Sequence, residues 1–195
     1  MKILLDGMGG DHAPEAVVAG AAAAAKEIDD EIAIIGDPAA ISKCLEKEGV
    51  NNGRIQIVEA SEVIGNDEAP VKAVRTKKDS SIVKGLNMVK NKEADVFISA
   101  GSTGALLAGG LFILGRIQGI DRPTLATVYP VIGMQPSLLV DTGANAECKP
   151  NNLLEFAIMG SIYMEKVLGR ENPTVGLVNN LSLIHISEPT RLALI

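Results

Sequence analysis

Aromatic side chains are scarce in this chain of 195 residues: they make up 3% of it, and tryptophan is absent. Proteins that bind single-stranded nucleic acid stack the bases on aromatic rings, so no nucleic-acid partner is expected. Basic residues are also outnumbered, with 18 Lys and Arg against 24 Asp and Glu and a formal net charge of −6. This balance argues against general binding of a phosphate backbone, but it permits a local basic cluster around a small anion.

The chain contains two cysteines, Cys44 and Cys148, which lie far apart and outside any metal-ligand spacing. With no secretory leader in front of them, we expect both to be free thiols in a reducing compartment. Residues 1–6 lack the long apolar core of a signal peptide. Glycine, proline or a charge interrupts every apolar stretch before the roughly 18 residues that a membrane helix needs. These absences predict a cytoplasmic protein without a transmembrane helix.

Hydrophobic residues make up 47% of the chain and charged residues 22%, as in a globular protein with a sizeable core. Short apolar runs alternate with segments of helical spacing. We predict strands at 2–6, 31–36, 54–59, 95–99, 124–129, 137–141 and 174–179, and helices at 14–27, 37–49, 79–92, 106–117 and 151–168. This alternation is typical of an α/β fold, a three-layer α/β/α sandwich around a mainly parallel, Rossmann-like sheet. The link between residues 129 and 137 is short enough for a hairpin.

Two glycine-rich loops each join a predicted strand to a predicted helix. They read Asp6-Gly-Met-Gly-Gly-Asp-His-Ala-Pro-Glu15 and Ser99-Ala-Gly-Ser-Thr-Gly-Ala-Leu106. Such a turn directs several backbone N–H groups at one point, and the helix dipole adds about half a positive charge there. The two loops therefore predict a phosphate site at the carboxyl edge of the sheet. Its candidate residues are Gly9, Gly10, Ser99, Gly101, Ser102, Thr103 and Gly104.

Three further groups beside these loops can do chemistry. With residues 181–195 set aside, His12 is the only histidine, and Asp11 precedes it. A histidine near phosphate can act as acid, base or hydrogen-bond donor, or it can be a loop residue without a chemical role. Asp6 and Asp141 each end a predicted strand, where a carboxylate caps the next segment, orients a histidine or binds a metal. No cluster has metal-ligand spacing, so no metal is predicted.

Arg75 and Lys78 lie in a basic segment that ends in Asp-Ser-Ser81. The guanidinium fork and the lysine point charge both suit phosphate oxygens, and Ser80 and Ser81 can add hydroxyls. The other interpretation is a solvated lysine run followed by the cap of a helix. We favour Arg75 as the functional residue of this segment.

No serine-nucleophile or dinucleotide-binding motif accompanies these residues. Residues 101–104 lack the Gly-x-Ser-x-Gly elbow. The first loop does not fit Gly-x-Gly-x-x-Gly, because position 12 is histidine. Acyl-serine and nicotinamide chemistry are therefore not predicted.

Four motifs, taken in order, resemble the bacterial phosphate acyltransferase family. They are the two glycine loops, with Lys77-Lys-Asp-Ser-Ser81 between them and Asp141-Thr-Gly-Ala-Asn145 after them. The resemblance covers residues 1–180 and implies the N-terminal part of one longer α/β domain, with a fold similar to phosphotransacetylases and to the isocitrate and isopropylmalate dehydrogenases. Residues 181–195 break the pattern and resemble a translated sequencing adapter, so we expect a non-native tail there.

The resemblance implies an enzyme that converts acyl-[acyl carrier protein] and inorganic phosphate to acyl phosphate and free carrier protein, with no cofactor. It also implies a glycerol-3-phosphate acyltransferase downstream in phospholipid synthesis, a homodimer, and peripheral contact with the inner face of the cell membrane. Two alternatives stay open. One is a phosphate acetyl- or butyryltransferase that uses acyl-coenzyme A, and the other is a non-catalytic fragment that binds phosphate or carrier protein.

The same resemblance marks the candidate residues without dividing their roles. Since phosphate is the nucleophile, the enzyme has to hold a dianion against a thioester carbonyl. We assign the dianion to the second glycine loop and the basic segment. The acid/base or thiolate-stabilising role goes to His12, held by Asp11 or Asp6. Asp141 and Asn145 are expected to shape the same cleft.

Overall fold

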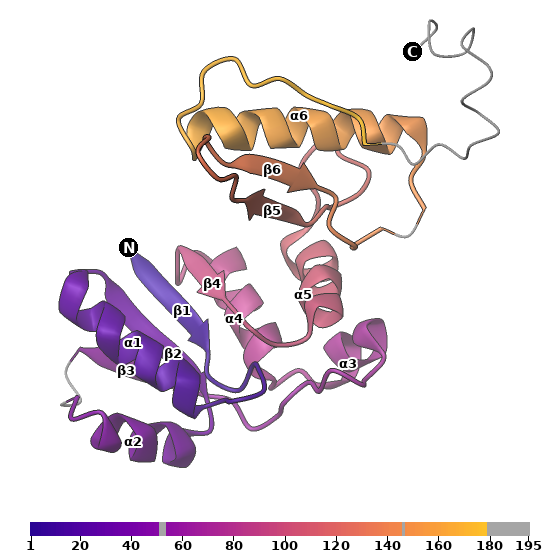
Figure 1. Cartoon of the computed structure of the whole chain (residues 1–195). Helices are drawn as coiled ribbons and strands as arrows, with labels where there is room; N and C mark the ends of the chain where they lie inside the picture. The colour runs from indigo at the N-terminus through magenta and orange to yellow at the C-terminus, as the bar shows by residue number, and fades with distance from the viewer. Residues whose placement is uncertain (51–53, 146, 179–195) are drawn as a thin grey trace, which may run out of the picture. The chain divides into compact units, whose positions relative to one another are not determined.

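The structure is a computed structural model, and it describes residues 1–50, 54–145 and 147–178. The chain forms two compact units, Met1–Pro123 and Thr124–Ile195, which we call unit 1 and unit 2. Figure 1 draws them in chain order from indigo to yellow. The predicted tail at 181–195 lies outside the described residues, and the assignment of 1–180 to one longer domain stays a prediction.

Unit 1 is built on a sheet of four parallel strands in the order β3-β2-β1-β4. The strands are β1 (Lys2–Asp6), β2 (Glu31–Gly36), β3 (Ile55–Glu59) and β4 (Val96–Ile98), close to the predicted bounds. The chain runs outward from β1 to β3 and then returns to the other side of β1 (Figure 1). The strand order therefore reverses between β1 and β4, which is where open α/β sheets bind ligands.

Helices cover both faces of this sheet. They are α1 (Glu15–Glu27), α2 (Pro38–Lys47), α3 (Pro70–Thr76), α4 (Ser81–Lys90) and α5 (Thr103–Gly109), which continues as the π-helical segment η1 (Gly110–Leu114). Ile34 of β2 packs with buried residues of α1 and α2, whereas its neighbour Ile35 packs on the other face with side chains of α4. Both isoleucines are fully buried, because a parallel strand between two helical layers is apolar on both faces. The predicted α/β/α sandwich is confirmed.

Helix α3 has no counterpart among the predicted elements, because its seven residues are too short to show a helical period. It begins at Pro70, whose fixed φ suits the first helical turn. Its start packs against α5, since a Cβ on Gly104 would lie 2.6 Å from the Pro70 Cγ. Helix α5 itself begins at Thr103, about one turn earlier than predicted.

Unit 2 contains an antiparallel hairpin, β5 (Ala126–Tyr129) and β6 (Ser137–Val140), and the helix α6 (Pro150–Lys166). The predicted hairpin is confirmed. Asn152 lies in the first turn of this helix, and its side chain accepts the Lys149 backbone N–H at 3.0 Å.

The strand predicted at 174–179 is wrong for residues 174–178, and residue 179 lies outside the described part of the chain. The sheet of unit 2 contains β5 and β6 within the described ranges, and neither pairs with this segment. A strand is defined by the ladder it shares with a neighbour, so an apolar segment without a partner does not become one.

A substitution at Gly85 of α4 tests the close packing of this helix on β4. A Cβ at this position would overlap the Phe97 ring, so we expect Gly85→Ala to lower the free energy of unfolding by about 1–3 kcal/mol, despite the better helix propensity of alanine. Gly20→Ala in α1 is the matched control, because a Cβ there meets nothing within 4 Å. It should raise stability by about 0.5–1 kcal/mol. Urea unfolding followed by circular dichroism measures both, and equal stabilisation by the two alanines would contradict the contact.

Candidate functional site

The loops after β1 and β4 meet because these two strands are parallel neighbours. Asp6, the last residue of β1, is 2% exposed. Its Oδ2 accepts the Ser99 hydroxyl at 2.7 Å, and its Oδ1 accepts the Met8 backbone N–H at 3.1 Å. The Ser99 Oγ in turn accepts the Gly101 N–H at 3.0 Å. A relay of hydrogen bonds through Asp6 thus joins the two glycine loops.

Gly9 lies where the two loops touch. A Cβ on it would stand 2.5 Å from the Asp6 Oδ2 and 2.8 Å from the Gly101 nitrogen, so no side chain fits there. Gly10 has a φ of +104°, a left-handed conformation that glycine adopts without strain. It also approaches Ala100, whose Cβ would be 3.3 Å from a Cβ on Gly10. The glycines of the first loop therefore allow the second loop to come close.

The second loop leads into the first turn of α5. Ser102 is the N-cap: it is 6% exposed, and its side chain accepts the Ala105 N–H at 3.4 Å. Thr103 and Gly104 follow as the first helical residues, where backbone N–H groups have no partner within the helix. These amides, next in the chain to the Asp6–Ser99 relay, are groups that can bind an anion.

His12 and Asp11 are exposed residues of the first loop. The His12 carbonyl accepts the Ala16 N–H at 2.9 Å, which fixes the loop backbone at the start of α1. In the part of the chain that the structure describes, the Asp6 carboxylate bonds to the Ser99 hydroxyl and a loop amide, not to the imidazole. The His12 side chain is accessible to a ligand.

The Arg75 guanidinium contacts the helical segment that follows the second glycine loop. It lies over the Phe112 ring of η1, 5.4 Å from the ring centre. The Lys78 Nζ donates to the Val74 carbonyl at 3.2 Å. Each cation thus has a contact of its own within unit 1.

Ser80 and Ser81 are buried at the start of α4, 0% and 2% exposed. The Ser80 Oγ donates to the Lys77 carbonyl at 2.8 Å and accepts the Val83 N–H at 3.4 Å. The cap that the sequence left open as an alternative is thus present in the structure. Contact of these two serines with phosphate stays a prediction, and Ser80 would have to leave its cap to make it.

Asp141 and Asn145 belong to unit 2, where they form a loop after β6. The Asp141 Oδ1 accepts the Leu125 N–H at 2.8 Å and the Thr124 hydroxyl at 2.9 Å, and its Oδ2 accepts the Asn145 N–H at 2.8 Å. Desolvation raises the pKa of this carboxyl, but these hydrogen bonds, with one from the Gly143 N–H, outweigh it and hold the pKa below its usual value. Asp141 is therefore an ionised anchor for both ends of the hairpin at neutral pH.

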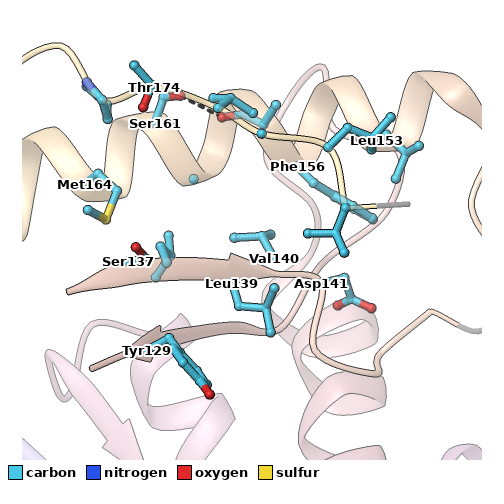
Figure 2. Close-up of a pocket in the computed structure, with 18 of the residues that line it drawn as sticks. Tyr129, Ser137, Leu139, Val140, Asp141, Leu153, Phe156, Ser161, Met164 and Thr174 are labelled. Atoms are coloured by element: carbon cyan, nitrogen blue, oxygen red, sulfur yellow. Dashed lines mark hydrogen bonds between the residues drawn. The ribbon is translucent and has the colours of Figure 1, made fainter. Parts of the chain in front are cut away.

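Unit 2 also contains a cavity of about 1070 Å³ that the sequence analysis missed. It lies between β6, α6 and the segment 170–178 (Figure 2), and Val140, Phe156 and Met164 are among its lining residues. Asp141 stands at its edge. The signal that could have found it is the number of apolar residues in 151–168, which exceeds what one face of a helix holds.

Within the described residues, no three His, Cys, Asp or Glu side chains lie together as a metal site requires. Nor does any helix in that part of the chain combine the length and apolarity needed to cross a membrane. Cys44 is buried and Cys148 is exposed, and both are free thiols.

Known proteins provide an independent comparison. A family model described as "Fatty acid synthesis protein" matches residues 1–181. Proteins named phosphate acyltransferase from Clostridium tetani and Alkaliphilus oremlandii are 55% and 57% identical over 180 and 179 residues, which is 92% of this chain. The matches cover 54% and 53% of those proteins, so the chain spans about half the length of the curated relatives it matches.

Among solved structures, a phosphotransacetylase from Streptococcus pyogenes superposes with a TM-score of 0.64, over 87% of this chain and 55% of its own. At 22% identity, this likeness concerns the fold alone. It confirms the α/β fold and its predicted similarity to phosphotransacetylases.

Removal of the Ser99 hydroxyl should destabilise unit 1. We expect Ser99→Ala to lower the free energy of unfolding by about 1–3 kcal/mol, because the buried Asp6 carboxylate loses a donor. In a chain that already carries Asp6→Asn, Ser99→Ala should lower the free energy of unfolding by a smaller amount. A double-mutant cycle by urea unfolding measures this coupling. Ser42→Ala on α2 is the control and should stay within about 0.5 kcal/mol of the parent. Strict additivity of the Asp6 and Ser99 changes would contradict the relay.

Asp141→Asn should destabilise unit 2 in a pH-dependent manner. The folded-state pKa lies below the usual value of 3.8, so the carboxylate contributes stability above about pH 4 and loses it as the pH falls through the lower folded-state value. The loss in the variant should be about 1–3 kcal/mol at neutral pH. Urea unfolding at pH 7 and at successively lower pH measures it, with the exposed Glu171→Gln as control. A loss that does not shrink in acid would argue against the ionised anchor.

Proposed function

We propose, because this chain belongs to the fatty acid synthesis protein family, that it supplies the phosphate-binding part of a phosphate acyltransferase. The acyl donor is acyl-[acyl carrier protein], and the product is an acyl phosphate. The observation that carries the proposal is the meeting of two glycine loops at the switch point of the sheet, tied by the Asp6–Ser99 bond and followed by the first turn of α5. Amides in such a turn suit a phosphate dianion.

In this reaction a phosphate oxygen attacks the thioester carbonyl carbon. A C–O bond forms, the C–S bond breaks, and the thiolate leaves with the bonding electrons and takes up a proton. No serine or cysteine nucleophile is needed, since phosphate is the nucleophile. The protein has to hold the dianion against the carbonyl and stabilise the charge that moves to oxygen and sulfur. The amides of Thr103 and Gly104, with the Thr103 hydroxyl, hold the dianion.

Asp6 is a positioning residue in this scheme. Its two oxygens already accept hydrogen bonds from Ser99 and from the Met8 amide, so the carboxylate is directed at the loops. A carboxylate facing the phosphate would repel it instead. By fixing Ser99, Asp6 fixes the Gly101 amide and the path of the chain into α5.

The remaining roles in unit 1 belong to His12, Arg75 and Lys78. His12, accessible on the first loop, provides the proton for the departing thiolate. Arg75 and Lys78 add positive charge at the dianion. For Asp141 and Asn145, a part in shaping the substrate cleft stays a prediction.

The carrier-protein donor follows from the resemblance of the motifs to the bacterial phosphate acyltransferases. With it come a glycerol-3-phosphate acyltransferase downstream in phospholipid synthesis, a homodimer, and peripheral contact with the inner face of the cell membrane. A phosphate acetyl- or butyryltransferase that uses acyl-coenzyme A is the second candidate, and the fold that this chain shares with a phosphotransacetylase is compatible with it.

A transfer assay separates the two candidates. Residues 1–180 are joined to the part of the Clostridium tetani relative that has no counterpart here, since this chain spans 54% of that protein. Release of free thiol from a long-chain acyl-[acyl carrier protein] is then measured with and without phosphate. We expect release that requires phosphate and yields a hydroxylamine-sensitive acyl phosphate. Arg75→Ala should raise the phosphate concentration for half-maximal rate at least about tenfold, because a charge-assisted contact is lost.

Lys43→Ala removes an exposed cation of α2 and is the matched control for Arg75→Ala. Release from acyl-coenzyme A but not from the carrier protein would favour the second candidate. Absence of thiol release with both donors would contradict both transfer reactions. It would leave only the non-catalytic fragment that binds phosphate or carrier protein. An unchanged phosphate requirement in Arg75→Ala would remove that residue from the site.

A further inference from the structure

The segment 61–69 leads from β3 to the start of α3, and polar contacts fasten it at both ends. At its first end, the Asp79 Oδ2 accepts the Ser61 N–H at 2.9 Å and the Ser61 hydroxyl at 2.6 Å. The Asp79 N–H in turn donates to the Glu62 Oε2 at 2.9 Å. Since Asp79 stands just before the cap of α4, these bonds hold the segment against the start of that helix.

Lys77 fastens the other end of the segment. Its Nζ donates to the Glu68 Oε1 and to the Val63 carbonyl, both at 2.6 Å. The same Glu68 oxygen accepts the Gly65 N–H at 2.7 Å, so one carboxylate and one ammonium close the turn. The hydrogen bond from Lys77 also holds the pKa of Glu68 below its usual value. The pair is therefore ionised at neutral pH.

The fastened segment is coupled to the first turn of α5 by packing. Ile64 is 6% exposed and belongs to one buried cluster with residues of α3 and with Ala105 of α5. Pro70, which follows the segment directly, lies so close to Gly104 that a Cβ there would be 2.6 Å from the Pro70 Cγ. The helices α3 and α5 lie side by side (Figure 1). A shift of the 61–69 segment would therefore shift the Gly104 amide.

An effect on position is what the Lys77–Glu68 pair can supply. The two side chains are 31% and 36% exposed, and an ion pair of that exposure adds little to the stability of a fold. By its charge alone, Glu68 would oppose the binding of an anion. What the pair does fix is the point at which the chain enters α3, and Pro70 at that point is in contact with the first turn of α5.

We propose that Lys77 and Glu68 are positioning residues for the anion site. By holding the 61–69 segment they hold the start of α3, and with it the Thr103 and Gly104 amides that bind the dianion. Both side chains act through packing and make no contact with the anion. The inference rests on the proposed function, because it takes these amides as the phosphate ligands.

Titration calorimetry of the 195-residue chain with inorganic phosphate tests the positioning role. The charge of Glu68 gives the test its sign, since loss of a carboxylate by itself favours an anion. We nevertheless expect Glu68→Ala to weaken phosphate binding about three- to fivefold, the upper range for an ion pair of this exposure. Glu68→Gln retains the acceptor oxygen and should recover most of the affinity. Asp67→Ala removes an exposed carboxylate one residue away and is the matched control, expected within about twofold of the parent.

Urea unfolding separates positioning from a general structural role. The midpoint of Glu68→Ala should stay close to that of the parent, because the pair is partly exposed. Lys77→Met is the second variant and should weaken phosphate binding as Glu68→Ala does.

Unchanged or tighter phosphate binding by Glu68→Ala would leave only the effect of its charge and overturn the proposal. So would an equal loss in Asp67→Ala, a loss of affinity that accompanies a fall in the urea midpoint, or absence of phosphate binding by the parent. A parent that binds phosphate but releases no thiol in the transfer assay would contradict the proposed reaction. The comparison of Glu68→Ala with Asp67→Ala would still test the positioning role, so the two failures are distinguishable.

Discussion

The hydrogen bond between Asp6 and Ser99 is the interaction on which the candidate site depends. It joins residues that are 93 positions apart in the chain and ties together the ends of β1 and β4. A buried carboxylate is stable only when its oxygens are satisfied, and here the donors are a hydroxyl of one loop and an amide of the other. Gly9 leaves the space in which Gly101 approaches. The course of the second loop into α5 follows from this contact.

The same contact also matters for the binding of an anion, because it involves the negatively charged Asp6 carboxylate. A carboxylate close to a bound anion would oppose binding. Both Asp6 oxygens instead accept hydrogen bonds from the loops and so hold the two loops together. The amides at the start of α5 then remain for a ligand. Fixed dipoles of this kind cost no reorganisation when an anion arrives. The cations Arg75 and Lys78 each have a contact within unit 1, Arg75 with the Phe112 ring and Lys78 with the Val74 carbonyl.

Local patterns predict the sheet of unit 1 well, because β1 and β2 are apolar runs that suit strands covered on both faces. The meeting of Asp6 and Ser99 is also predictable, since both end strands of one parallel sheet. The stacking of Arg75 on Phe112 is not, because no short-range pattern specifies which helix lies beside α3. Nor can a sequence distinguish Ser80 as a cap from Ser80 as a ligand, because both roles need a serine ahead of a helix.

The contrast between the two units explains why an apolar pattern fails to make a strand at 174–178. Five of the six β2 residues are buried between helices, whereas all four β5 residues are exposed and β6 alternates between exposed and half-buried. In the part of the chain that the structure describes, the strands of unit 2 are therefore less covered by other elements than those of unit 1. Strand formation is non-local, since its hydrogen bonds come from another segment. A segment with the sequence pattern of a strand therefore forms a strand only when another segment pairs with it.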